Sequence, residues 1–234
     1  MNSVPRRVLA VDDDPVSLAV TALLLEAEGC LVRQAQSGKQ ALDLALSDPP
    51  DCILADLRMP GLASTELALS LRKAAPRALL LAMSASPPAH LDGYDGVLSK
   101  PLSSADLRAA LSRGPSVAVP HEPDGATHVV IDAAIFERLR HAITPDGLRE
   151  IFTVFVDDTQ QRLGTMRHAD PETIRREAHT IKGGAAMLGA VQVSRAAALV
   201  EAGIDDPDDR RRKLDEIEAR CRDAELILKQ RLKS

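Results

Sequence analysis

The sequence predicts two folded units, a doubly wound α/β unit with a five-stranded parallel sheet followed by a helical bundle. From Arg7 to about Arg113, short apolar runs alternate with stretches of helical periodicity, which is typical of parallel strands joined by helices. From Ile131 onward no comparable strand run occurs, and helical periodicity takes over. The length of 234 residues exceeds that of a typical single domain and agrees with two units.

Five apolar runs are predicted to form the sheet. Three of them are apolar throughout, as expected of parallel strands that are buried on both faces, and two are weaker. In chain order the runs are 8–11, 31–32, 52–55, 79–83 and 97–98, of which the second and the last are the weak ones. The helical patterns between and after them cover 15–28, 39–47, 64–74 and 104–111. In a sheet of this kind, ligands bind beyond the carboxyl ends of the strands.

Glycine and proline are frequent at 114–125, where no periodicity is sustained, and this predicts a linker. We therefore expect one unit at 1–114, a linker at 115–130 and a second unit at 131–234. Helices of the second unit are predicted at 133–143, 147–168, 171–188, 193–202 and 207–232. Asp170 is the predicted N-cap of the third of these, because a proline follows it in the first turn. An apolar stripe then runs along that helix through Ile174, Ala178, Ile181, Ala185 and Leu188.

The composition argues against several classes of protein. Apolar residues make up 45% of the chain, as in ordinary globular proteins, but aromatic residues only 2%, so the cores are expected to consist of Leu, Val, Ile and Ala. The net charge of −5 argues against nucleic-acid binding. Cys30, Cys52 and Cys221 have neither disulfide nor zinc spacing. No segment has the length and apolar character of a membrane span, and we expect a cytoplasmic protein that binds neither nucleic acid nor membrane.

The most informative stretch is 178–189, where a lysine and a glycine follow a histidine at helical spacing. His179, Lys182 and Gly183 share one face of the predicted helix. A histidine beside apolar residues is often a core residue, but the helical phase places His179 away from the apolar stripe, on the face of Arg175 and Arg176. Such cations suit a bound anion. Gly183 and its neighbour could mark a helix end, yet the stripe continues past them to Leu188, so they are expected inside the helix.

Acidic residues follow two predicted central strands of the sheet. Asp14 precedes a proline and is explained as a helix cap, but capping does not explain Asp12 and Asp13. Asp56 follows the third strand, so these carboxylates are expected to converge at one rim. Carboxylates that are crowded together repel one another unless a cation joins them, and hard oxygen ligands suit Mg²⁺. Two further strand ends add Ser84 and Lys100, a hydroxyl and an ammonium group that complete an anion-binding pocket.

The order of these groups at four strand ends resembles a response-regulator receiver domain, and 178–189 resembles the phosphorylation site of histidine phosphotransfer (HPt) domains. The resemblance implies a flavodoxin-like sheet followed by a four-helix bundle. It also implies roles for individual residues. Asp56 and His179 would be the phosphoacceptors; Asp12, Asp13, Asp56 and the backbone carbonyl of Arg58 would bind Mg²⁺; Ser84, Lys100 and Lys182 would contact the phosphoryl group; and Gly183 would leave room for a docking partner.

Two departures from the receiver pattern concern its conformational readout. The stretch from Ser84 to Lys100 is shorter than usual, so the fourth helix, around 88–92, is expected to be truncated or replaced by a loop. Val97 stands where receivers commonly carry a switching aromatic residue, and Tyr94 is out of register. We expect phosphorylation to change this face less than in other receivers; a substitute role for Tyr94, through different packing, stays open.

Three functions are compatible with this pattern. The first is a phosphorelay intermediate that receives a phosphoryl group from a sensor histidine kinase and exchanges it with a receiver-domain protein. The second is a regulated binding module in which the receiver gates access of outside partners to His179. The third is a hydrolase, but no substrate-binding region is evident. Neither a P-loop nor the asparagine and glycine boxes of sensor kinases occur, so we expect a phosphotransfer signalling protein rather than a turnover enzyme or an ATP-dependent kinase.

Overall fold

The computed structural model of the chain describes residues 5–59, 64–85, 91–113, 130–204 and 206–232. The chain divides into two compact units, Met1–Pro123 and Asp124–Ser234. Within the described ranges, no helix combines the length and the apolar character needed to cross a bilayer.

The first unit is built on a five-stranded parallel sheet with the strand order β2-β1-β3-β4-β5, which confirms the predicted fold class. The strands are β1 (Arg7–Val11), β2 (Leu31–Ala35), β3 (Cys52–Asp56), β4 (Leu79–Ser84) and β5 (Gly96–Ser99). β3 lies at the centre and is buried along its whole length. β2 is longer than its apolar run predicted, because an edge strand is partly exposed and accommodates polar residues such as Arg33 and Gln34.

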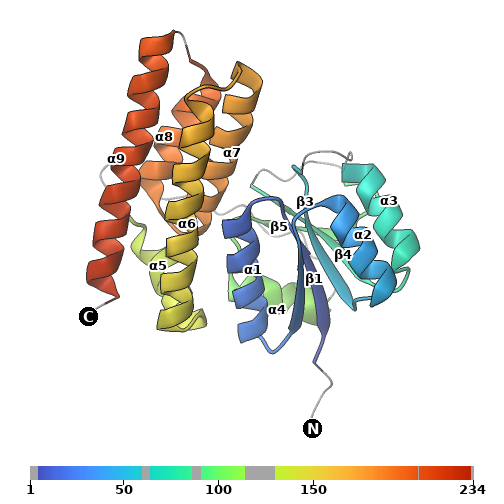
Figure 1. The fold of residues 1–234 in the computed structure, drawn as a ribbon. Helices are drawn as coiled ribbons and strands as arrows, with labels where there is room; N and C mark the ends of the chain where they lie inside the picture. The colour runs from blue at the N-terminus through green and yellow to red at the C-terminus, as the bar shows by residue number, and fades with distance from the viewer. Residues whose placement is uncertain (1–4, 60–63, 86–90, 114–129, 205, 233–234) are drawn as a thin grey trace. The chain divides into compact units, whose positions relative to one another are not determined.

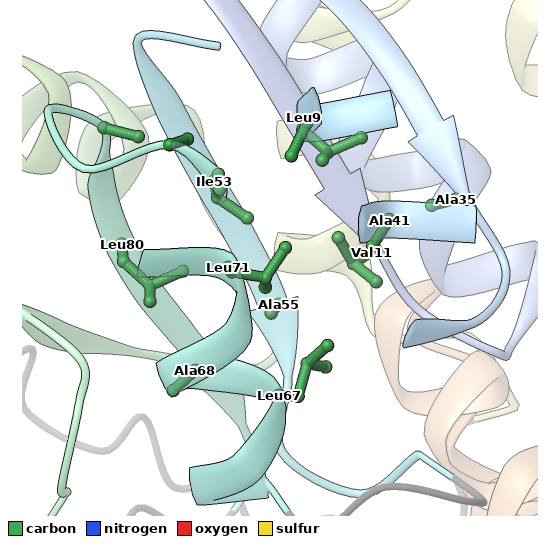
Figure 2. Packing of buried hydrophobic residues seen from close by; sticks show 13 residues of the cluster. Leu9, Val11, Ala35, Ala41, Ile53, Ala55, Leu67, Ala68, Leu71 and Leu80 are labelled. Atoms are coloured by element: carbon green, nitrogen blue, oxygen red, sulfur yellow. The ribbon is translucent and has the colours of Figure 1, made fainter. Parts of the chain in front are cut away.

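Four helices cover the two faces of this sheet. They are α1 (Pro15–Ala27), α2 (Gly38–Ser47), α3 (Ser64–Ala74) and α4 (Ser104–Arg113). α2 and α3 lie on one face, and α1 and α4 on the other (Figure 1). Asp14 caps α1 by accepting a hydrogen bond from the backbone N–H of Val16, as predicted. Between the sheet and α2 and α3 lies an apolar cluster (Figure 2), which includes Leu9, Val11, Ala41, Ile53, Ala55, Leu67, Ala68, Leu71 and Leu80.

The connection from β4 to β5 differs from the alternation of strand and helix in the rest of the unit. None of its described residues, Ala85 and 91–95, is helical. The expected helical remnant around 88–92 falls mostly outside the described residues, and its last two positions, Leu91 and Asp92, are not in a helix. Where the structure describes it, this connection is therefore a turn that leads into β5.

The second unit is helical, as predicted. Its helices are α5 (Ala133–Ala142), α6 (Pro145–Met166), α7 (Pro171–Met187), α8 (Val191–Ala202) and α9 (Pro207–Arg231). The four longer ones, α6 to α9, run side by side as a four-helix bundle (Figure 1). α5 is a short addition to the bundle, and the guanidinium of Arg231 lies 5.2 Å from the centre of its Phe136 ring.

Helix α7 has the start and the buried face that its sequence predicts. The side chain of Asp170 accepts hydrogen bonds from the backbone N–H groups of Glu172 and Thr173, at 3.0 and 2.9 Å. The expected glycines, Gly183 and Gly184, lie inside the helix. Every residue of the predicted apolar stripe is at most 2% exposed: Ile174, Ala178, Ile181, Ala185 and Leu188. This burial fixes the orientation of α7 and turns His179 away from the core.

Candidate functional sites

The three expected carboxylates converge at the carboxyl ends of two adjacent strands. Asp12 follows β1 and Asp56 ends β3, and these strands pair with each other. One oxygen of each of Asp12, Asp13 and Asp56 lies within 4.8 Å of the others. Asp12 is only 1% exposed and Asp56 9%, so these two carboxylates of the cluster are buried at the edge of the sheet.

Lys100 bridges two of these carboxylates. Its Nζ lies 2.7 Å from Oδ2 of Asp12 and 2.6 Å from Oδ1 of Asp56. Burial opposes the charged form of Lys100, but the two carboxylates outweigh it and raise the pKa of its ammonium group. The lysine that follows β5 thus reaches the aspartate that ends β3, and it stays charged beside the residue expected to accept phosphate.

The negative charge of Asp13 is poorly compensated by the groups around it. Burial, with the negative charges of Asp12 and Asp56, raises its pKa from 3.8 to about 6. A divalent cation at this position would neutralise the excess negative charge. The donor set consists of hard carboxylate oxygens, which Mg²⁺ prefers, so the residues present fit such an ion.

Backbone and side-chain donors orient the cluster. The hydroxyl of Ser17, on α1, donates to Oδ2 of Asp12 at 2.6 Å. The backbone N–H of Asp14 donates to Oδ1 of Asp12 at 3.0 Å, and that of Arg58 to Oδ2 of Asp56 at 2.7 Å. Ser17 was not foreseen; its only signal in the sequence is a hydroxyl on the buried face of α1, which does not reveal a partner.

Ser84 occupies the same rim. It ends β4, is 4% exposed, and its backbone carbonyl accepts a hydrogen bond from the N–H of Lys100 at 2.9 Å. Arg58 is held next to Asp56 by its own N–H. The sequence-predicted residues of the receiver pocket are therefore brought to one edge of the sheet, on the strand ends that were expected.

His179 is held by a glutamate from the neighbouring helix. Its Nδ1 lies 2.6 Å from Oε1 of Glu201, on α8, while Oε2 of the same carboxylate accepts from Nζ of Lys182 at 2.5 Å. An ionised carboxylate only accepts hydrogen bonds, so Nδ1 of His179 carries a proton, and in the neutral ring the lone pair then lies on Nε2. The side chain of His179 is 30% exposed.

The charge of Glu201 is maintained by its two partners. Burial opposes its ionisation, but the hydrogen bonds and charges of Lys182 and His179 outweigh this and lower the pKa of the carboxyl group. Sequence reasoning predicted only cations around His179 and missed this anion. The reason is that Glu201 lies on another helix, and the periodicity of α7 carries no information about which residues of α8 face it.

The surroundings of His179 otherwise agree with the predicted face. Arg175 and Arg176 are exposed, and Arg176 pairs with Glu177 at 3.4 Å. Gly183 lies one helical turn from His179 and is partly exposed. The hydroxyl of Ser194, on α8, donates to the backbone carbonyl of Lys182 at 3.2 Å and ties the two helices together next to the site.

Comparison with known proteins places both units in families. Residues 8–112 match the response regulator receiver domain, and residues 150–230 match the Hpt domain. The chain is 35% identical over 113 residues to the response regulator MprA of Mycolicibacterium vanbaalenii, covering 46% of this chain and 49% of MprA.

Two sensor proteins match across both units. The chain is 27% identical over 200 residues to the aerobic respiration control sensor protein ArcB of Escherichia coli, covering 78% of this chain and 26% of ArcB. It is 31% identical over 226 residues to the virulence sensor protein BvgS of Bordetella parapertussis, covering 83% of this chain and 18% of BvgS. The chain thus spans about half the length of MprA and about a quarter or less of the two sensors. It belongs to the two-component phosphorelay proteins, with a receiver domain followed by a histidine phosphotransfer domain.

Proposed function

We propose that this chain is a phosphorelay intermediate that accepts a phosphoryl group on Asp56 and carries one on His179, to or from receiver domains. The observation that carries the proposal is the contact between Glu201 and Nδ1 of His179, because a proton held on Nδ1 places the lone pair of the neutral ring on Nε2, the atom that would act as nucleophile, on the same chain as an acidic receiver pocket. The domains would be bounded as the sequence predicts, with the receiver at 1–114, the linker at 115–130 and the HPt domain at 131–234.

In the receiver, Asp56 would attack the phosphorus of a phosphohistidine on the donor. The new bond joins a carboxylate oxygen to phosphorus, and the phosphorus–nitrogen bond breaks with its electron pair going to the donor imidazole. Mg²⁺, held by Asp12, Asp13, Asp56 and the backbone carbonyl of Arg58, would supply charge neutralisation for the phosphoryl oxygens. Lys100 and Ser84 would contact the transferred group, and the contact of Lys100 with Asp56 supports this role for its ammonium group.

In the HPt domain, Nε2 of His179 would attack the phosphorus of an aspartyl phosphate. The phosphorus–oxygen bond breaks and the aspartate leaves as a carboxylate. The ring gains positive charge as its lone pair is used, and the carboxylate of Glu201 at Nδ1 stabilises that charge. Lys182 would stabilise the phosphoryl oxygens, and Gly183 would allow the backbone of a docked receiver to approach.

The partners that this chemistry needs are a sensor histidine kinase as phosphoryl donor and a second receiver-domain protein. The test is to mix the full chain with a phosphorylated cognate kinase and to follow the label in the wild type, Asp56→Asn and His179→Gln. Phosphohistidine is stable in alkali and aspartyl phosphate is not, so the two labels can be separated. His141→Gln, which changes an exposed histidine on α5, is the matched control for the histidine change.

We expect Asp56→Asn to lose both labels and His179→Gln to lose only the alkali-stable one, while His141→Gln behaves as the wild type. An alkali-stable label that persists in Asp56→Asn at the wild-type rate would show that His179 is loaded from outside, as in a regulated binding module. Lasting alkali-labile label in Asp56→Asn would refute the assignment of Asp56.

A further inference from the structure

A buried serine on α1 contacts the acidic cluster. Ser17 is the third residue of α1 and is 1% exposed, and its hydroxyl donates a hydrogen bond of 2.6 Å to Oδ2 of Asp12. Hydroxyl groups inside helices commonly donate to the backbone carbonyl one turn earlier, as those of Thr153, Thr165 and Thr180 do in this chain. The hydroxyl of Ser17 donates to a carboxylate of the cluster instead, so it forms part of the surroundings of the expected metal site.

The position of Ser17 is fixed by the start and the packing of α1. Asp14 caps the helix, and a proline follows it in the first turn. The neighbours of Ser17, Val16 and Leu18, are each 1% exposed, which fixes the rotation of the helix against the sheet. The hydroxyl therefore has a defined place relative to the end of β1, where Asp12 lies.

Most of the hydrogen-bonding capacity of Asp12 is used. Its Oδ1 accepts from the backbone N–H of Asp14 at 3.0 Å, whereas its Oδ2 accepts from both Ser17 and Nζ of Lys100, at 2.6 and 2.7 Å. An ionised carboxylate has about four acceptor positions, two on each oxygen, so the two donors saturate Oδ2. The acceptor position that is left for a cation is therefore on Oδ1.

The two donors at Oδ2 of Asp12 differ in their other contacts. Nζ of Lys100 also lies 2.6 Å from Oδ1 of Asp56, and in the proposed function this ammonium group contacts the phosphoryl group. Within the described part of the chain, the hydroxyl of Ser17 donates to Asp12 alone. Ser17 is thus the donor that belongs to Asp12, whereas Lys100 is divided between two carboxylates.

We propose that Ser17 is a positioning residue for the metal site: its hydroxyl keeps Oδ2 of Asp12 occupied, so that Oδ1 is the atom that binds Mg²⁺. Ser17 itself would touch neither the ion nor the phosphoryl group and acts through Asp12. Carboxylates that bind metal ions are commonly oriented by such hydrogen bonds, and the loss of one weakens the metal affinity. This inference rests on the proposed function, because it takes Asp12 as a ligand of Mg²⁺.

The affinity of the full chain for Mg²⁺, measured by calorimetric titration, tests this role in Ser17→Ala and a matched control. The control is Thr21→Val, one turn further along the same buried face of α1. Thr21 is 0% exposed, and its hydroxyl has no hydrogen-bond partner among the described residues. We expect binding about tenfold weaker than in the wild type for Ser17→Ala and within about twofold of it for Thr21→Val. Ser17→Cys, which fills the space of the hydroxyl with a weak donor, should weaken binding as alanine does.

Labelling and unfolding measurements separate positioning from a loss of stability. With acetyl phosphate as donor, the alkali-labile label on Asp56 should form more slowly in Ser17→Ala at low Mg²⁺ concentration and recover most of the wild-type rate at saturating Mg²⁺. A purely structural role would lower the unfolding temperature with and without the ion and leave the affinity unchanged.

That result, or binding in Ser17→Ala as tight as in the wild type, would overturn the inference. The expected difference in affinity without any label in the wild type would support the inference and contradict the proposed function. A wild type that does not bind Mg²⁺ would contradict the inference.

Discussion

Oε1 of Glu201 lies 2.6 Å from Nδ1 of His179, and the two residues come from adjacent helices, α8 and α7. The contact sets the tautomer of the imidazole, because the carboxylate requires the proton on Nδ1. The second oxygen of Glu201 accepts a hydrogen bond from Lys182. The site therefore contains one anion and one cation besides the imidazole. The chemistry of His179 is therefore controlled from a helix other than its own.

Glu201→Gln should slow phosphoryl transfer to His179. The amide keeps the shape of the side chain but removes its charge, so neither tautomer of the imidazole is enforced and the developing positive charge is less stabilised. We expect the rate of transfer from a phosphorylated receiver to fall about tenfold, the difference between a charged and a neutral hydrogen bond. The measurement is the appearance of alkali-stable label, together with nitrogen NMR of the imidazole.

Glu218→Gln is the control for this change. It removes the same charge from α9 of the same unit, where Glu218 pairs with Arg167 and Arg222 at the surface. The control should transfer at the wild-type rate. Equal rates in the two variants, or an imidazole spectrum that is unchanged in Glu201→Gln, would show that Glu201 has only a structural role.

Mg²⁺ binding to the receiver should weaken below about pH 6. Asp13 has its pKa raised from 3.8 to about 6, so a proton competes with the ion on this carboxylate as the pH falls through that value. Calorimetric titration at several pH values should show a nearly constant affinity above pH ~7 and a decrease approaching tenfold per pH unit well below the pKa of Asp13. An affinity that is constant down to pH ~4.5 would contradict the assignment of Asp13 as a ligand.

The same shift predicts how the stability of the metal-free receiver depends on pH. Because the folded-state pKa of Asp13 is above its ordinary value, the folded protein binds more protons than the unfolded chain between about pH 4 and 6. The contribution of Asp13 to the free energy of unfolding therefore decreases as the pH rises through this window. Added Mg²⁺ should restore part of the loss, which thermal unfolding with and without the ion can measure.

Gly93→Ala should destabilise the receiver more than Gly29→Ala. Both glycines have positive φ, +86° and +79°, so alanine is strained at either position, by about 1 kcal/mol. At Gly93 the new methyl group would also lie 2.9 Å from that of Ala68, whereas nothing lies within 4 Å at Gly29. We expect the difference in free energy of unfolding between the two variants to be about 1–3 kcal/mol in urea titrations. Equal values would mean that the contact with α3 relaxes freely.

Transfer from Asp56 to His179 should take place within one chain. Two sites on one chain meet at an effective concentration near the millimolar range if their geometry allows it, above that of a partner at about micromolar concentration. The rate at which label leaves Asp56 for His179 should therefore be independent of protein concentration. A rate that rises in proportion to concentration would mean that the sites meet only between molecules, and no transfer at any concentration would favour the regulated binding module.

The elements and the acidic pocket were predictable because their signals are local. A strand shows as a run of apolar residues, and a parallel sheet brings the ends of its strands to one rim, so the convergence of Asp12, Asp13 and Asp56 followed from the order of the elements. The start of α7 followed from Asp170 and the proline after it. The roles of these residues in phosphotransfer remain predictions.

The partners of Ser17, Tyr94 and Glu201 could not be predicted, because each lies on a different element from the group it contacts. Helical periodicity tells which face of a helix is buried but not which residue of the next helix lies opposite. For Tyr94 the difficulty was greater, because the sequence left open whether a truncated helix or a loop joins β4 to β5, and the neighbours of the tyrosine depend on this.

The two sites differ in how much of the chain is needed to build them. Asp12 and Lys100 are far apart in the receiver sequence and follow β1 and β5, which are separated in the sheet by β3 and β4. The pocket therefore depends on the pairing of these four strands. His179, Lys182, Gly183 and Glu201 all belong to one helical hairpin, α7 and α8, closed by a tight turn at Gly189. Separation of β5 from the sheet would therefore remove Lys100 from the pocket, whereas fraying of α5 or of the end of α9 leaves the histidine and its glutamate on the same hairpin. A phosphoryl group on His179, as proposed, would therefore be held by residues of a single hairpin.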